Sequence, residues 1–147
     1  MDDGETACPP ENEARSASPA GLDAVIGLGA NLGAPERQLR WAIGEIARKS
    51  HLVATSKLYR SVPVGGPPQP DFQNAAVRIH FEGSTRQLLE TLLGIERIAG
   101  RERRERWGPR VLDLDILWVA GVCVSEADLV IPHPRLRQRA FALCPLL

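Results

Sequence analysis

Apolar residues follow two patterns along this chain, and the two patterns alternate. Short runs in which apolar residues dominate or take every second position are typical of strands, and recurrence every three or four residues is typical of helices. Strand-like runs lie at residues 24–28, 52–59, 75–81, 111–119 and 129–131. Helices are expected from Pro35 onward, after a capping Ser84, and over residues 138–143.

The order of these segments predicts the fold class. Strand, helix and strand follow one another twice, and a Pro- and Gly-rich loop over residues 61–73 separates the two units. We therefore expect an α/β (α+β) sandwich of ferredoxin-like type, with a mainly antiparallel sheet and helices packed on its faces. A turn at Ala120-Gly121 is expected to lead into a hairpin strand over residues 122–124.

Residues 1–22 differ from the rest in composition. They are rich in Pro, Ser, Ala, Gly and acids, so we expect a disordered acidic tail or linker, followed by one domain over residues 23–147. The formal net charge is +0, but the acids of the tail leave the remaining chain mildly basic. That balance suits a phosphate-bearing ligand and is too weak to require nucleic acid.

Several classes of protein are disfavoured by the sequence. No apolar run approaches the roughly 20 residues of a membrane helix, and the N-terminus resembles neither a secretory signal nor a transit peptide. The odd number of cysteines, Cys8, Cys123 and Cys144, favours ordinary reduced residues over a disulfide framework or zinc site. We expect a cytoplasmic protein without membrane contact.

The motif with the clearest chemistry is Leu112-Asp113-Leu114-Asp115-Ile116. In a strand, Asp113 and Asp115 would project from one face and their apolar neighbours from the other, with the two acids attached roughly 6–7 Å apart. Paired magnesium ions in phosphoryl-transfer sites lie about 3.5–4 Å apart, so two such carboxylates could share them. The alternative is the polar outer face of an ordinary strand, on which adjacent acids would be mildly unfavourable.

An arginine-rich segment, residues 101–110, immediately precedes that motif. Gly100, Gly108 and Pro109 mark it as a loop, and guanidinium groups offer paired donors to phosphate oxygens. A loop of this kind could close over a bound polyphosphate. A solvated charge run is the alternative, and the adjacency of the aspartates favours the functional interpretation.

Other residues could bind a flat heterocycle. Phe72 and Phe141 could stack on a fused ring, and the amide of Asn74 could contact ring edges. Taken alone, however, each phenylalanine is more often a core residue and the asparagine a turn residue. His133, held between two prolines, could contact a phosphate or a nucleotide, although a lone histidine is more often structural. Residues 27–33, GLGANLG, lack the spacing of a dinucleotide fingerprint and predict a tight turn with close packing.

Taken together, these segments resemble the 6-hydroxymethyl-7,8-dihydropterin pyrophosphokinases of folate synthesis. The resemblance covers residues 24–147 and lies in GLGANLG, LYRSVPVGG, QPDFQNAAV, IERIAGRERRERWGPRVLDLDIL and IPHPRLRQRAFALCPL. It implies transfer of pyrophosphate from ATP to the hydroxymethyl group of a reduced pterin, with release of AMP. It also implies ATP as co-substrate and two Mg²⁺ ions.

The resemblance assigns roles to individual residues. The implied catalytic residues are Arg101, Arg110, Asp113 and Asp115, of which the two aspartates also bind metal. The implied ATP contacts are Glu96, Arg103, Trp107, Arg110, Ile116, His133 and Arg139. The implied pterin contacts are Ser61, Val62, Val64, Phe72, Asn74 and Phe141.

Some expectations go beyond the site. Relatives usually run on past the apolar segment at which this chain ends, so we expect a domain truncated at its C-terminus. We expect a monomer whose partners are small molecules and not nucleic acid. The alternatives left open by the residues are a two-metal nucleotidyltransferase or phosphodiesterase, and a non-enzymatic RNA-binding module of ferredoxin-like fold.

Overall fold

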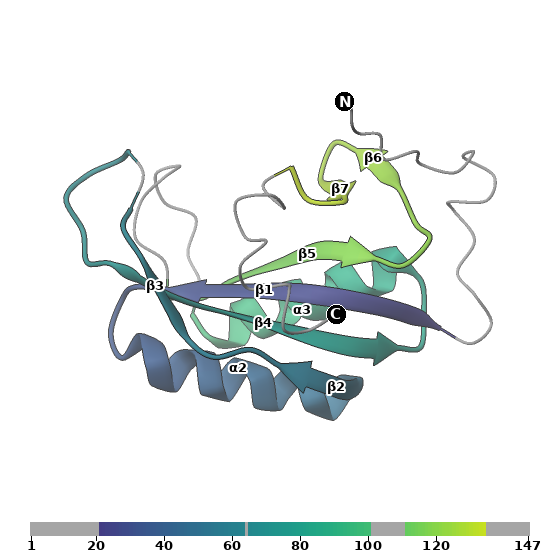
Figure 1. Cartoon of the computed structure of the whole chain (residues 1–147), viewed down its shortest axis with the longest axis horizontal. Coiled ribbons are helices and arrows are strands. Elements are labelled where there is room, and N and C mark those ends of the chain that lie inside the picture. Colours follow the sequence, from purple (N-terminus) through teal and green to yellow (C-terminus); the bar gives the residue numbers. More distant parts are fainter. Residues whose placement is uncertain (1–20, 64, 101–110, 135–147) are drawn as a thin grey trace.

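An antiparallel sheet forms the centre of the computed structural model, which describes residues 21–63, 65–100 and 111–134 (Figure 1). Strand β1 (Leu22–Ala30) lies between β4 (Phe72–Phe81) and β5 (Asp113–Val119). Strands β2 (His51–Thr55) and β3 (Tyr59–Ser61) both pair with β4. The order β2-β4-β1-β5 is that of two interleaved strand–helix–strand units, so the expected ferredoxin-like α+β topology is confirmed.

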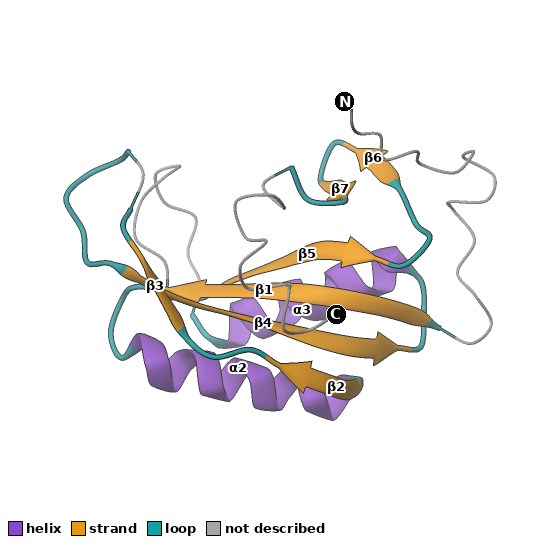
Figure 2. Ribbon diagram, viewed as in Figure 1, coloured by secondary structure: helices purple, strands orange, loops and turns teal. Residues whose placement is uncertain are grey.

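Two helices connect the strands of these units. Helix α2 (Pro35–Lys49) begins at the expected proline. Helix α3 (Thr85–Ile98) begins after Ser84, which forms a reciprocal capping box with Gln87. Both helices have one apolar side, and Figure 2 shows them beside the sheet.

The main core lies between one face of the sheet and both described helices. Leu39 and Ile46 of α2 and Leu88 and Leu92 of α3 are buried against residues of β1, β4 and β5. The β1 residues that belong to this core occupy alternate positions: Leu22, Ala24, Ile26, Leu28 and Ala30. The other face carries a second, smaller buried cluster of Val25, Ala76 and Leu117. We call it the open face, because neither α2 nor α3 packs on it.

A small two-stranded sheet follows β5. The turn at Ala120-Gly121 forms as expected, and the Val122 amide donates to the Val119 carbonyl at 3.2 Å. The expected hairpin over residues 122–124 is wrong, because β6 (Val124–Glu126) pairs with β7 (Leu129–Ile131) and not with β5. Arg86 at the start of α3 bonds to Glu126 and Asp128, which attaches this hairpin to the helix.

Other differences concern boundaries and one cysteine. The expected strand over 52–59 is divided into β2 and β3, because the Ser56 hydroxyl, instead of a backbone carbonyl, accepts the Ala76 amide at 2.8 Å. The expectation of reduced cysteines is wrong for Cys123, which is disulfide-bonded. An odd number of cysteines with irregular spacing does not exclude a bond between two cysteines that are distant in sequence. The helix expected over 138–143 lies outside the described residues.

Candidate active site

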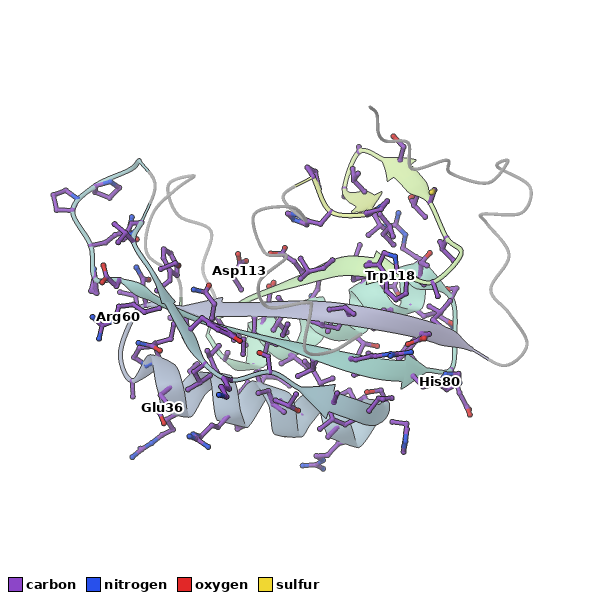
Figure 3. The ribbon with its side chains drawn as sticks, in the orientation of Figure 1. Glu36, Arg60, His80, Asp113 and Trp118 are labelled. Carbon is purple, nitrogen blue, oxygen red and sulfur yellow. The ribbon has the colours of Figure 1, made fainter. Side chains whose placement is uncertain are left out.

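The paired aspartates lie where their spacing predicts. Asp113 and Asp115 are partly exposed on the open face of β5, while Leu114 and Ile116 between and beyond them are buried in the main core. Figure 3 shows Asp113 projecting from β5 on the side away from α2. The two carboxylates therefore share one face of the sheet, without a helix of the described residues over them.

The strand next to the aspartates contributes glycines at the matching positions. Gly29 pairs with Asp113, and Gly27 pairs with Asp115. A Cβ atom at Gly29 would lie 3.2 Å from Asn74 Oδ1, and one at Gly27 would lie 3.0 Å from Leu117 Cδ1. Because glycine has no side chain, no side-chain atoms project from the sheet at these two positions beside the acids.

These glycines correct one expectation about the chain. Residues 27–30 belong to β1 and do not form the predicted tight turn, although the close packing expected there is present. Glycine inside a strand often marks a place where another group approaches closely. Here the approaching groups are the side chains of Leu117 and Asn74.

Asn74 lies two strands away from Asp113, across Gly29. It pairs with Gly29 on one side and with Tyr59 of β3 on the other. Its amide nitrogen Nδ2 donates to Ser61 Oγ at 2.7 Å and to the Tyr59 carbonyl at 3.3 Å. Asp113, Gly29, Asn74 and Tyr59 thus form one row across β5, β1, β4 and β3, which we call the site row.

Two other residues with implied pterin contacts lie beside the site row. Phe72 begins β4 and pairs with Ser61, and it shares the strand face of Asn74 because side chains alternate. Val62 follows β3 and is 72% exposed. Ser61, Phe72 and Asn74 are therefore brought together by the pairing of β3 with β4, and Val62 follows Ser61 in the chain.

His133 reaches the second aspartate from a different part of the chain. Its Nε2 lies 3.7 Å from Asp115 Oδ1, a contact that is an ion pair when the imidazole is protonated. Its backbone amide donates to the Leu117 carbonyl at 2.9 Å, which fixes this segment beside β5. The sequence indicated a rigid corner at His133 but gave no signal that it would approach Asp115.

Glu96 contacts β5 from the helix side of the sheet. It is 2% exposed, and its Oε2 accepts the Leu114 amide at 2.6 Å. Leu114 lies between the two aspartates, so this buried carboxylate holds the backbone that carries both of them. Ile116 is 4% exposed and its side chain belongs to the core. Nucleotide contacts at Glu96 and Ile116 stay predictions.

The chain also matches known proteins over most of its length. The model of the family 7,8-dihydro-6-hydroxymethylpterin-pyrophosphokinase matches residues 25–147. The chain belongs to this family.

Individual relatives of the pterin pyrophosphokinase family show the extent of the similarity. A 2-amino-4-hydroxy-6-hydroxymethyldihydropteridine pyrophosphokinase of Synechocystis sp. is 44% identical over 125 residues, which cover 84% of this chain and 64% of the relative. A protein of the same name from Haemophilus influenzae is 43% identical over 127 residues, covering 85% and 79%. The "Folate synthesis bifunctional protein, mitochondrial" of Arabidopsis thaliana is 42% identical over 125 residues, covering 84% and 23%.

Seven residues assigned from the family resemblance lie outside the described part of the chain, and their positions stay predictions. They are Val64, Arg101, Arg103, Trp107, Arg110, Arg139 and Phe141.

The described residues fit the magnesium site that the sequence predicts. They contain no group of three or more His, Cys, Asp and Glu that could enclose a metal ion. Magnesium in phosphoryl-transfer sites commonly takes one or two carboxylates and completes its shell with water and substrate phosphates. Asp113 and Asp115, partly exposed and on one face, are a donor set of that kind.

Two α-helices, α2 and α3, lie within the described residues. None of those formed by the described residues is long and apolar enough to cross a bilayer.

Proposed function

We propose that this chain transfers the pyrophosphoryl group of ATP to the hydroxymethyl oxygen of 6-hydroxymethyl-7,8-dihydropterin and releases AMP, as a step of folate synthesis. Family membership over residues 25–147 and the names of the relatives support this activity. The observation that carries it in the structure is the site row, which joins Asp113 to Asn74 across Gly29 on one open face. The chain spans 64% of the length of the Synechocystis relative, and for this reason the activity of the whole relative is a proposal for this chain.

The acidic end of the site row is the proposed ATP side. Asp113 and Asp115 would hold two Mg²⁺ ions. Such ions supply charge neutralisation on both sides of the β-phosphorus, where the bond to the departing AMP oxygen breaks and the bond to the pterin hydroxyl oxygen forms. The low surface at Gly27 and Gly29 would leave room for the phosphates beside the carboxylates.

Two residues near the aspartates would support them. Glu96, through the Leu114 amide, would keep the β5 backbone in place as charge gathers on the open face. His133, 3.7 Å from Asp115, would lie beside the nucleotide phosphates, where a protonated imidazole offers an additional cation. Both proposals give a role to residues for which the family resemblance implies nucleotide contacts.

The arginines of residues 101–110 would complete the ATP side. Arg101 and Arg110 would add positive charge to the transferring group, and Arg103, Trp107 and Arg139 would contact the nucleotide. Guanidinium groups hold phosphate oxygens in pairs, and their effect is greatest when they meet charge that develops in the transition state. Positioning and electrostatics would therefore supply most of the catalysis.

The amide end of the site row is the proposed pterin side. Phe72 and Phe141 would stack on the two faces of the ring, and Asn74 would contact its edge. Ser61, Val62 and Val64 would form the adjoining wall. A hydroxymethyl group on a ring bound here would point along the site row toward Asp113 and the β-phosphorus.

The fate of each ATP phosphate tests the proposed function. The chain is incubated with Mg²⁺, 6-hydroxymethyl-7,8-dihydropterin and ATP labelled at the β-phosphorus, and the products are separated by chromatography. We expect equal amounts of AMP and a pterin diphosphate that carries the label. Release of ADP, transfer of AMP to the acceptor, or AMP without a pterin product would contradict the proposal and favour another phosphoryl-transfer or hydrolytic enzyme.

Some further properties stay predictions. We propose a monomer that acts on small molecules without nucleic acid, located in the cytoplasm, with the residues before Leu22 as a tail outside the catalytic domain. Leu22, expected in the tail, begins β1 and is buried in the main core. The disulfide at Cys123 is unusual for a reducing compartment. Sedimentation of the purified chain would test the monomer.

A further inference from the structure

A buried asparagine lies just past the end of β1, outside the set of residues assigned so far. Asn31 is 2% exposed. Its Nδ2 donates to Gln69 Oε1 at 2.8 Å and to the Pro70 carbonyl at 2.9 Å. Both acceptors lie in the Pro- and Gly-rich loop between β3 and β4, far from Asn31 in sequence.

In both of these hydrogen bonds the Asn31 amide donates to the same loop. A side-chain amide carries two N–H donors, and two acceptors of the loop lie within hydrogen-bond distance of that nitrogen. Gln69 also donates to the Pro67 carbonyl at 3.3 Å, so the contact continues into the loop. Loss of these bonds would be costly because the Asn31 side chain is buried. A buried donor or acceptor that loses its partner cannot form a hydrogen bond to water in its place.

The two ends of the same loop are therefore held by two asparagine side chains. Asn74 donates to Ser61 Oγ at the start of the loop, and Asn31 bonds to Gln69 and Pro70 at its end. Phe72 follows Pro70 by two residues. Residues 62–71 contain several prolines and glycines, so side-chain contacts such as these help to fix the path of the chain.

We propose that Asn31 is a positioning residue for the pterin side of the site. It fixes the end of the loop over residues 62–71, and thereby the placement of Phe72 and of the wall that begins at Ser61. This inference rests on the proposed function, because it takes the pterin as the ligand of that side. Asn31 itself need not touch either substrate.

Substitution of Asn31 should weaken pterin binding and leave ATP binding nearly unchanged. In Asn31→Asp, a carboxylate oxygen replaces Nδ2 and faces two oxygen acceptors, so the attachment is lost at almost constant shape. We expect the KM for the pterin to rise about tenfold, the usual effect of losing a buried hydrogen bond of this kind. We expect the Kd for ATP to change by less than about twofold, and kcat at saturating pterin to fall less than kcat/KM.

A second variant and a stability control keep the test decisive. Gln69→Ala removes one acceptor from a partly exposed position and should raise the pterin KM in the same direction if Asn31→Asp does not fold. Ser84→Ala removes the capping box of α3 and destabilises the chain away from the loop. We expect Ser84→Ala to lower the melting temperature and leave the pterin KM unchanged.

The attachment is also measured without turnover, by limited proteolysis within residues 62–71. Cleavage should be faster in Asn31→Asp and Gln69→Ala than in wild type, and unchanged in Ser84→Ala. Unchanged cleavage together with an unchanged pterin KM in folded Asn31→Asp would overturn the inference, as would equal losses of pterin and ATP binding. If wild type makes no pterin diphosphate while cleavage responds as stated, the proposed function fails and the loop attachment stands.

Discussion

At the scale of single residues, the site depends on two like charges that the fold keeps side by side. Asp113 and Asp115 share the open face of β5, with no residue on that face between them. Adjacent acids on one strand face repel each other, and bound cations offset that repulsion. The alternation of acids and apolar residues predicted this geometry from the sequence. The approach of His133 to Asp115 was not predictable in the same way, because it depends on the path of β6 and β7.

Arg110, three residues before β5 in the sequence, provides a prediction at this scale. In Arg110→Ala, we expect kcat to fall by about 10³-fold, because arginines that meet transition-state charge contribute on that order. We expect the Kd for ATP to rise much less. Single-turnover rates and ATP titrations of the same preparation separate the two effects.

Arg40→Ala is the matched control for that arginine. Arg40 lies on α2 and pairs with Glu36 at the surface, so its loss should leave both constants unchanged. A change in Arg110→Ala confined to ATP affinity would mean that the arginine only tethers the nucleotide.

At the scale of elements, β1 determines what the open face can accommodate. The glycines at 27 and 29 suggested a strand that ends early, since glycine is depleted in strands. In the structure β1 continues to Ala30, because β4 and β5 pair with it on both sides along this stretch. Local sequence patterns do not show such pairing partners, and the division of β2 from β3 at Ser56 was missed for the same reason.

Gly29→Ala tests whether the low surface in the site row matters. The added Cβ would lie 3.2 Å from Asn74 Oδ1, tighter than ordinary contact, so the amide must shift by a few tenths of an ångström. We expect the pterin KM to rise roughly fivefold to tenfold, since small displacements of a positioned group are costly. Steady-state kinetics with varied pterin at saturating ATP measures this change.

Gly44→Ala provides the comparison for that substitution. Gly44 lies within α2, and a Cβ there would meet nothing within 4 Å. Alanine in the interior of a helix should stabilise the chain by roughly 0.5–1 kcal/mol without changing the kinetics. Equal pterin KM values in Gly29→Ala and Gly44→Ala would show that the site row tolerates a side chain at Gly29.

At the scale of the whole molecule, one face of the sheet forms the core and the other carries the candidate site. One face is buried under α2 and α3, and the other presents the acids and Asn74. Sequence order predicted the split strand–helix–strand topology, because apolar periodicity determines which segments are helices and which are strands. The pairing of β6 with β7 and the contact between Asn31 and Gln69 depend on residues brought together only by the folded chain.

An ion pair across β1 and β4 makes global stability depend on pH. Arg78 Nη2 lies 2.8 Å from Asp23 Oδ2, and the hydrogen bond from Arg78 lowers the pKa of Asp23 below its usual 3.8. Stabilisation by this group is therefore present above that value and is lost as pH falls through the lower pKa of the folded chain. Because both side chains are about one-third exposed, we expect a small effect.

The contribution of this ion pair to stability is measured from the free energy of unfolding of wild type and Asp23→Asn at several pH values. Wild type should have the larger free energy of unfolding at neutral pH, with a gap that stays constant down to about pH 4 and closes below it. A gap that persists unchanged at lower pH would rule out ionisation of Asp23 as its source.

The most direct test of the whole account is AMP formation by Asp115→Ala in the presence of ATP, Mg²⁺ and 6-hydroxymethyl-7,8-dihydropterin. Asp115 is partly exposed, so the variant should melt near the wild-type temperature. Removal of a metal ligand should lower kcat by about 10³-fold or more, since metal ions supply several kcal/mol to such transition states. Glu90→Ala, which removes an exposed acid of α3, should retain full turnover. Near-normal AMP formation by folded Asp115→Ala would contradict the account.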